Sequence, residues 1–408
     1  MNQIKTVELA KVVNWGLLTF VMFWTGLVIL CSLYMTIPLL SVFAEEFTIT
    51  ANQAAWAGSI FSIFFAIGCV FFGIMSEKFG LKRVMVFGLL CLGALTILVG
   101  FASDFRQLLI FRALQGIASA TFSPVAITYI GKVFPPERRV TTLGFLSTGF
   151  LFAGIVGQLV SSFMEPRINW QSVFYFFGVV YFITVPLLLL LPQDVRDKNK
   201  DLLLIMKKFK IPFQQKTIII TYFISITILL TFVGMYTALG ESLKQNFNFN
   251  DQQIFLVRAA GGIGILISPF TGKLAKKFSI YPVVYSGFLL AIIGLFSMGF
   301  SKDLYTTIIM SVLFVAGIAT VVPTLLAIVG DLGGENKGIV TSLYTFILFI
   351  GASLGPIIST GIMQTGALTL PFIIFGCILL GSLLLTLSLK RIVVKKEIME
   401  QERNSSVM

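Results

Sequence analysis

Long apolar segments alternate with short polar ones along nearly all of the 408 residues. A helix that crosses a bilayer needs about 20 predominantly apolar residues, and hydropathy identifies twelve segments of that kind. The first is about 30 residues long and lacks a small-residue cleavage site, so we expect a retained helix rather than a signal peptide. The segments lie at 14–43, 54–76, 84–102, 107–130, 140–164, 171–192, 217–241, 254–275, 281–300, 304–330, 338–363 and 367–389. The pattern predicts an all-α polytopic membrane protein with twelve transmembrane helices.

The longest polar interval, residues 193–216, divides the twelve segments six and six. It predicts an N-terminal six-helix bundle over 1–192, a cytoplasmic linker over 193–216, a C-terminal six-helix bundle over 217–389 and a cytoplasmic tail over 390–408. Within the linker, the apolar stretch 202–206 lies next to lysines. That stretch fits either a short amphipathic helix on the membrane surface or a plain tether.

Basic residues gather on one side of this predicted topology. The side that holds the N-terminus, the linker and the tail carries 24 of the 30 lysines and arginines. The loops on the other side keep Arg106, Arg167, Lys244 and Lys302. Because cytoplasmic loops are enriched in Lys and Arg, both termini are predicted to be cytoplasmic in a multi-pass protein of the inner (plasma) membrane. The net charge of +12 then reflects topology, and nucleic-acid binding is not expected.

Composition excludes several classes of protein. Charged residues make up 12% of the chain, whereas a soluble domain carries roughly 25%, so a water-soluble enzyme is excluded. The absence of histidine removes His-based metal sites and catalytic triads, and no phosphate-binding G-x-x-x-x-G-K-[ST] loop occurs. The cysteines lack a C-x-x-C spacing. We therefore expect no enzymatic activity, no metal and no cofactor.

Similar segments recur in the two halves of the chain. Residues 73–80 resemble residues 272–279, which lie 199 positions later. Residues 116–119 resemble residues 317–320. Together with the six-plus-six count, these matches predict a duplicated six-helix unit. Parallel repeats of that kind place a substrate site near the bilayer midplane, between the halves.

Four short motifs occur at matching places in the twelve-segment pattern. Residues 73–83 read Gly-x-x-x-Glu-Lys-x-Gly-x-Lys-Arg, and residues 112–116 read Arg-x-x-Gln-Gly. They resemble the loop signature between helices 2 and 3 and the fourth-helix signature of the major facilitator superfamily of secondary transporters. Residues 134–139 and 169–174 are similar to segments of its twelve-helix drug–proton antiporter branch. The resemblance spans essentially the whole chain and implies the major facilitator fold.

The resemblance also implies a conformational latch at the cytoplasmic end of helix 2. The acid at Glu77 is expected to cap the start of helix 11 near Gly338 to Thr341, where the positive helix end favours a carboxylate. Such a cap stabilises an outward-open state. The latch residues are Gly73, Glu77, Lys78, Gly80, Lys82 and Arg83.

Helix 5 departs from the pattern of the antiporter branch. Gly157 fits the glycine ladder of that signature, but the Gly-Pro at the end of the ladder is absent. A Gly-Pro occurs in helix 11 instead, as Gly355-Pro356, and a proline there permits a bend because it lacks a backbone donor. We expect helix-bend positions at Gly157, Gly355 and Pro356.

Ionisable groups inside a membrane span are costly and mark candidate functional sites. Arg112 and Arg258 are the clear cases, and Gln115 and Ser119 share a helical stripe with Arg112. Arg112 fits either a cavity-lining charge that holds substrate or a structural donor to neighbouring carbonyls. Arg258 fits either a cavity role or snorkelling to the outer interface.

Acidic residues are nearly absent from the spans. Glu241 is predicted to end helix 7 on the same stripe as Thr231, so it is the candidate for a titrating carboxylate. A solvated helix end is the alternative interpretation, and Asp104 is the alternative acid. The predicted substrate and proton cavity comprises Arg112, Gln115, Ser119, Thr231, Glu241 and Arg258.

A cavity with two arginines and no deep carboxylate suits a neutral, zwitterionic or anionic compound better than a cationic one. We expect a secondary active transporter that works by alternating access, with proton-coupled efflux of a small amphipathic, zwitterionic or anionic compound. An uptake symporter or uniporter for a small organic anion is one alternative, and a non-transporting membrane sensor is another. The expected partners are a small-molecule substrate, protons and the lipid bilayer, with the chain acting as a monomer.

Overall fold

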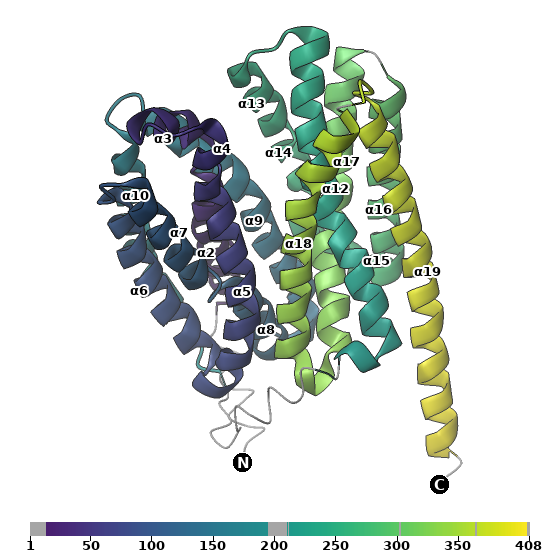
Figure 1. Cartoon of the computed structure of the whole chain (residues 1–408). Helices are drawn as coiled ribbons and strands as arrows, with labels where there is room; N and C mark the ends of the chain where they lie inside the picture. The colour runs from purple at the N-terminus through teal and green to yellow at the C-terminus, as the bar shows by residue number, and fades with distance from the viewer. Residues whose placement is uncertain (1–13, 195–209, 211, 302, 364, 406–408) are drawn as a thin grey trace.

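The structure is a computed structural model, and the described chain is all-helical. It describes residues 14–194, 210, 212–301, 303–363 and 365–405. Within these residues, twelve helical segments are long and apolar enough to cross a membrane, as the sequence predicts. They form two bundles that stand side by side, one from each half of the chain (Figure 1). The apolar stretch predicted at 202–206 lies outside the described residues.

Several membrane-crossing segments are built from two or more shorter helices. The N-terminal bundle contains α2 (Trp15–Tyr34) with η1 (Ile37–Leu39) and α3 (Leu40–Glu46), α4 (Ala51–Ala54), α5 (Trp56–Phe79), α6 (Leu81–Gly100), α7 (Phe105–Ser119), α8 (Ser123–Val133), α9 (Pro136–Met164) and α10 (Trp170–Leu189). The C-terminal bundle contains α12 (Lys216–Phe247), α13 (Asp251–Ala260), α14 (Gly262–Ile265), η4 (Ser268–Phe270), α15 (Thr271–Phe278), α16 (Ile280–Phe300), α17 (Leu304–Leu332), α18 (Lys337–Met363) and α19 (Leu370–Ser405). Proline lies in the first turn of α8 and of η4, where the missing backbone donor is tolerated.

Two helices are longer than hydropathy predicts. α12 runs past 241 to Phe247, and α19 continues through the predicted tail to Ser405. Hydropathy locates the apolar band of a helix, whereas polar turns can extend the same helix into water. Asn248, with a left-handed φ of 53°, ends α12. Glu241 therefore lies within a helix, and the prediction that it ends helix 7 is wrong.

The starts of matching helices in the two halves are capped in the same way. The Asp104 carboxylate accepts a hydrogen bond from the backbone N of Gln107 in α7 at 2.9 Å. Asp303, 199 positions after Asp104, accepts one from Thr306 in α17 at 2.8 Å. The bonds from Thr306 hold the pKa of Asp303 below its usual value. These caps satisfy free N–H groups at helix starts and support the predicted duplication.

The tight turns from α5 to α6 and from α15 to α16 also match. Gly80 has a φ of 96°, and Ser279, again 199 positions later, has a φ of 70°. Glycine adopts a positive φ without steric cost, whereas serine is strained there. The N-terminal half therefore has the residue that the turn favours, and the C-terminal half forms the same turn under strain.

The predicted match of residues 116–119 with 317–320 is out of register. Gly116 packs against the backbone of Phe61 in α5, whereas Gly317 packs against the backbone of Ala291 in α16. The caps and turns relate the halves by 199 positions, and this match requires 201. The two short motifs therefore resemble each other without occupying the same place in the repeat.

Glycines bring one helix pair in each half into close backbone contact. Gly149 and Gly157 of α9 lie against the backbone of α2, and Gly351 and Gly355 of α18 lie against the backbone of α12. A side chain at any of these positions would push the backbones apart. Close packing thus accounts for Gly157 and Gly355. Pro356 lies inside an unbroken α18, and a bend there stays a prediction.

One face of the molecule collects the helix ends that carry most of the basic residues. We call it the basic face and define it by the α5–α6, α8–α9 and α15–α16 turns and the start of α18. Its cations include Lys78, Lys82, Arg83, Lys132, Arg138, Arg139, Lys276, Lys277 and Lys337. The ribbons of the two bundles approach each other toward this face, at the bottom of Figure 1, and diverge toward the opposite face. The location of the basic face in the cytoplasm stays a prediction.

Candidate functional site

The two bundles meet at the basic face through α5 and α18. Gly73 of α5 lies directly against the side chain of Ser342 and near the backbone of Gly338. One turn further along α5, the Glu77 side chain lies against Gly338, in the first turn of α18. Because the contact is so close, a larger side chain at Gly73 would separate the two helices.

A second contact, related to the first by the repeat, joins α9 to η4 and α15. Gly272, 199 positions after Gly73, lies directly against Thr141 of α9. The Ser268 hydroxyl donates a hydrogen bond to the Gly144 carbonyl oxygen at 2.9 Å. Two repeat-related contacts therefore close the basic face. In each of them, the second membrane-spanning segment of one repeat packs against the opposite bundle.

Glu77 supplies a carboxylate to the contact between α5 and α18. It forms an ion pair with Lys132 of α8 at 2.6 Å, and its side chain is 7% exposed. Gly338, which it contacts, belongs to the helix start whose positive dipole end favours a negative charge. The geometry is that of the expected cap on helix 11. The use of Glu77 as a latch stays a prediction.

Lys82 and Asp194 each cap the other's helix, an arrangement that we call a reciprocal cap. Lys82 of α6 caps the end of α10, and Asp194, which follows α10, caps the start of α6. The buried Lys82 Nζ donates to the carbonyl oxygens of Leu189 at 2.7 Å and Leu191 at 2.5 Å. The Asp194 carboxylate accepts from the backbone N atoms of Leu81 at 2.7 Å and Lys82 at 3.1 Å. Sequence reasoning misses this cap, because Asp194 lies at the start of the predicted linker, far along the chain from its partners.

The other predicted latch residues shape the α5–α6 turn. Gly80 supplies the positive φ, Lys78 lies 6.0 Å from the centroid of a neighbouring aromatic ring, and Arg83 is exposed. Gly73 and Glu77 contact the opposite bundle, as described above. Of the predicted latch residues, Gly73 and Glu77 therefore lie in the interface between the bundles. Gly80 and Lys82 stabilise structure within the N-terminal bundle.

Toward the middle of the membrane the interface becomes aromatic. Between α8 and α18, the hydroxyls of Thr128 and Thr341 form a hydrogen bond of 2.8 Å. Deeper in the bilayer, the ring centroids of Phe65 in α5 and Phe349 in α18 are 4.6 Å apart in a T-shaped contact. On the repeat-related side, Gly262 of α14 packs against side chains of α9. The closure thus extends from the basic face to these aromatic contacts.

Arg112 of α7 is fully buried inside the N-terminal bundle. Its Nε donates to the Ala57 carbonyl of α5 at 2.9 Å, and its Nη1 donates to the Ser32 carbonyl of α2 at 2.9 Å and to Gln115 Oε1 at 2.5 Å. The guanidinium carbon lies 4.3 Å from the centroid of the Phe61 ring. Among the described residues, Nη2 has no hydrogen-bond partner and no acidic side chain pairs with this arginine. Carbonyls, an amide and an aromatic face therefore hold the charge.

The polar network around Arg112 crosses the N-terminal bundle. Gln115 Nε2 donates to Thr96 Oγ1 of α6 at 2.7 Å. On the other side, the hydroxyls of Ser32 in α2 and Tyr181 in α10 are 2.6 Å apart and form a hydrogen bond. The sequence predicts Arg112 and Gln115 but misses Thr96, Ser32 and Tyr181. A buried arginine requires partners, but its position does not say which distant helix supplies them.

Two candidate residues of the C-terminal bundle lie near one end of α12. Arg258 Nη2 donates to the Tyr236 carbonyl oxygen at 2.9 Å, and its guanidinium also lies against Gly240. Glu241 is half-buried and accepts a hydrogen bond of 2.5 Å from Gln245. The structure thus places Arg258 beside the residue that precedes Glu241.

The six predicted cavity residues do not form one cluster. Arg112, Gln115 and Ser119 belong to the N-terminal bundle, and Thr231, Glu241 and Arg258 belong to the C-terminal one. Ser119 is buried with a hydroxyl that lacks a partner in the described part of the chain. Thr231 donates to backbone carbonyls of its own helix, and Asp104, the alternative acid, caps α7. A joint role of these residues in substrate and proton binding stays a prediction.

Comparisons with other sequences agree with this architecture. The family model for the Major Facilitator Superfamily matches residues 22–356 and, in a second match, 221–406. The uncharacterized MFS-type transporter YybF of Bacillus subtilis (strain 168) is 25% identical over 346 residues, which cover 83% of this chain and 84% of that protein. Multidrug resistance protein MdtG of Escherichia fergusonii is 23% identical over 381 residues, which cover 90% of this chain and 93% of that protein.

Solved structures share the fold at low sequence identity. The proton:xylose symporter XylE bound to 6-bromo-6-deoxy-D-glucose has a TM-score of 0.77 at 15% identity, covering 91% of this chain and 95% of that one. The human organic anion transporter MFSD10 has a TM-score of 0.74 at 14% identity, covering 92% of this chain and 100% of that one. With the family model covering most of the sequence, the chain belongs to the Major Facilitator Superfamily and is a membrane transporter, not an enzyme.

Proposed function

We propose that this transporter works by alternating access and exports a small amphipathic, zwitterionic or anionic compound in exchange for protons. The observation that carries the proposal is the closed basic face, where α5 contacts α18 and α9 contacts α15. With the basic face in the cytoplasm, this arrangement corresponds to an outward-facing state. Rocking of one bundle against the other would open the basic face to the cytoplasm.

The buried charge supports a substrate that is not a cation. Within the described chain, Arg112 and Lys82 are buried cations, and the acid Glu77, whose side chain is 7% exposed, is paired with Lys132 at the basic face. In the low-dielectric interior, the Arg112 guanidinium repels a cationic compound and attracts an anionic or zwitterionic one. The multidrug resistance protein MdtG among the relatives supports export as the direction of transport.

Glu241 is our candidate for the proton step. It is half-buried in α12, and the adjacent Gly240 packs against the Arg258 guanidinium. Arg258 of α13 thus contacts the residue that precedes Glu241, and a movement of α13 relative to α12 would link this end of α12 to the conformational change.

Thermal shift and energised flux together test this proposal. A panel of anions, zwitterions and cationic dyes is first screened for compounds that raise the Tm of the purified protein. Inverted membrane vesicles should then accumulate the stabilising anion or zwitterion when their lumen is acidified. Accumulation in right-side-out vesicles instead would identify uptake, and absence of energised flux in both orientations would identify a sensor.

The proton step is tested by Glu241→Gln, and Glu165→Gln is the matched control. Glu165, like Glu241, is a half-buried acid near the face opposite the basic face. We expect Glu241→Gln to abolish the response of flux to the pH gradient while exchange of labelled for unlabelled substrate continues. The control should keep the wild-type response. The same pH dependence in wild type and Glu241→Gln would remove Glu241 from the mechanism.

A further inference from the structure

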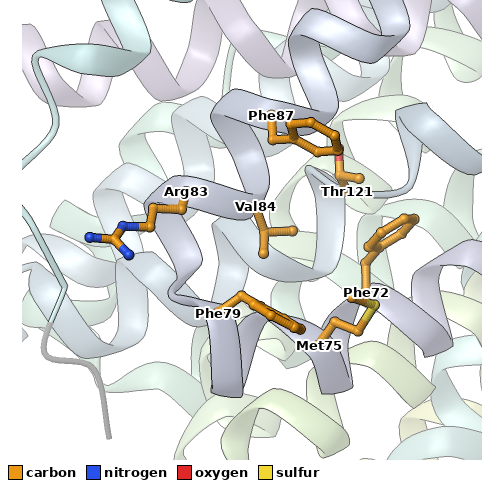
Figure 2. A pocket seen from close by; sticks show the side chains of 7 residues that line it. All are labelled: Phe72, Met75, Phe79, Arg83, Val84, Phe87 and Thr121. Atoms are coloured by element: carbon orange, nitrogen blue, oxygen red, sulfur yellow. The ribbon is translucent and has the colours of Figure 1, made fainter. Parts of the chain in front are cut away.

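A groove opens between α5 and α6 near the basic face, away from the contact between the bundles. Its cavity has a volume of about 400 Å³. The lining side chains from the two helices are Phe72, Met75 and Phe79 of α5 and Arg83, Val84 and Phe87 of α6 (Figure 2). Thr121 also lines the cavity, and its hydroxyl donates to the Ala118 carbonyl oxygen at 2.7 Å. Apart from Arg83 and Thr121, the lining side chains are apolar, so the groove suits a hydrocarbon chain.

The groove lies on the outside of the N-terminal bundle. Phe87 is 68% exposed and Phe79 is 41% exposed, and in a membrane-spanning bundle such surfaces face lipid. The face of α5 that carries Gly73 and Glu77 packs against α18, on a different side of the helix from the groove. The occupant therefore comes from the bilayer rather than from the space between the bundles.

A cation stands at the mouth of the groove. Lys82 is bound to the backbone at the end of α10, whereas Arg83 is exposed and forms no ion pair or hydrogen bond with the other described residues. Its guanidinium points away from Phe72 and Met75 (Figure 2). Arginine matches the geometry of a phosphate group, and anionic lipids are attracted to basic segments at the cytoplasmic leaflet.

We propose that this groove binds one anionic phospholipid, with an acyl chain against Phe72, Met75 and Phe87 and its phosphate at Arg83. The repeat supports a single site per molecule. At 199 positions after Arg83 and Phe87, the C-terminal half has Pro282 and Ser286, so it lacks both the cation and the aromatic wall. The proposal is independent of the transported substrate.

Native mass spectrometry of the purified full-length protein tests the proposal. The protein in detergent is titrated with dioleoyl phosphatidylglycerol or dioleoyl phosphatidylcholine, and the lipid retained per chain is counted. The wild type should retain one phosphatidylglycerol with about fivefold preference, as expected for one arginine near an anionic lipid. Arg83→Gln should remove the preference, and Val84→Phe, which fills the cavity, should reduce retention of both lipids.

Lys277→Gln, at the repeat-related α15–α16 turn, is the matched control and should keep the preference. Glycerol phosphate, the headgroup without chains, should not compete at the same concentration. The proposal is overturned by an unchanged preference in Arg83→Gln or by an equal loss in the control. Competition by glycerol phosphate would assign the groove to a soluble phosphate, and displacement by a transported amphipathic compound would make it a substrate entry route.

Discussion

The two halves share a framework of helices but differ in what they bury. Asp104 and Asp303 cap matching helices, and Gly80 and Ser279 form matching turns. The polar network of the N-terminal half keeps only hydroxyl groups at two of the repeat-related positions. The residues 199 positions after Ser32 and Arg112 are Thr231 and Ser311, which donate to carbonyls of their own helices, and those after Thr96, Gln115 and Tyr181 are Leu295, Phe314 and Leu380.

This difference indicates that the helix packing, which both halves share, does not depend on the buried charge of the N-terminal half. In the described part of the C-terminal half, the buried polar residues are serines and threonines and none is charged, so the framework does not require a buried arginine. A charged residue in a membrane span is costly and is retained where it functions. We therefore propose that Arg112 is present for transport and not for folding.

The largest effect is expected from Arg112→Gln, which removes the charge that distinguishes the halves. A central arginine costs about 2.5 to 3.5 kcal/mol by insertion estimates, so the yield of folded protein should be unchanged or higher. The initial rate of substrate flux, normalised to protein amount, should fall at least about tenfold. Arg112→Lys should retain more flux, and Ser311→Ala, at the repeat-related position, should be close to wild type.

Normal flux in Arg112→Gln would return Arg112 to a structural role. Loss of folded protein in Arg112→Gln, with normal yield of Arg112→Lys, would show that the charge serves folding. Either result would contradict the proposal that Arg112 is present for transport and not for folding.

A smaller and symmetric effect is expected at the two glycine contacts between the bundles. Gly73→Val and Gly272→Val each force a side chain into the opposite bundle and should weaken the closure by about 1 to 3 kcal/mol. Labelling of Thr128→Cys by a water-soluble maleimide, in a background without native cysteines, should become faster in both. Gly361→Val is the control, because a Cβ there meets no atom within 4 Å.

Faster labelling with Gly73→Val and not with Gly272→Val would show that α5 and α18 alone control closure. Faster labelling with Gly361→Val as well would show that the assay reports general loosening. Both outcomes contradict a closure made from two repeat-related contacts.

The smallest effect is expected at the matching turns. Ser279→Gly should relieve the positive φ and raise the free energy of unfolding by up to about 1 kcal/mol. Gly80→Ser should lower it by about 1 to 2 kcal/mol, because serine is strained at that φ. Thermal unfolding of the purified variants measures both, and changes of the same sign would contradict the equivalence of the two turns.

The number and order of the membrane-spanning helices could be predicted from the sequence. Apolar length is a direct requirement of the bilayer, and the similarity of segments 73–80 and 272–279 is enough to indicate the 199-residue repeat. The end of α12 at Phe247 could not be predicted by hydropathy, since a helix continues into water when its polar turns are good helix formers. The match of 317–320 failed because a short run of small residues recurs at many helix contacts.

The candidate site could be predicted in part. Arg112 is identified by a charge in an apolar segment, and Glu77 by its place in a motif. The partners of Arg112 include the carbonyl of Ala57, which any residue would supply. The hydroxyl of Tyr181 reaches the network around Arg112 from a distant helix through Ser32. Such contacts have no signature in the sequence. The reciprocal cap of Lys82 and Asp194 escapes prediction for the same reason.

The central claim is that contacts around Glu77 close the basic face and that the bundles rock to open it. Spin labels at Glu137 and Lys276 follow the basic face, and labels at Arg167 and Lys244 follow the opposite face, at exposed sites in different bundles. Glu77→Gln removes the negative charge from the start of α18. Double electron–electron resonance should show a longer distance across the basic face and a shorter one across the opposite face. Unchanged distances on both faces, or lengthening on both, would contradict the account.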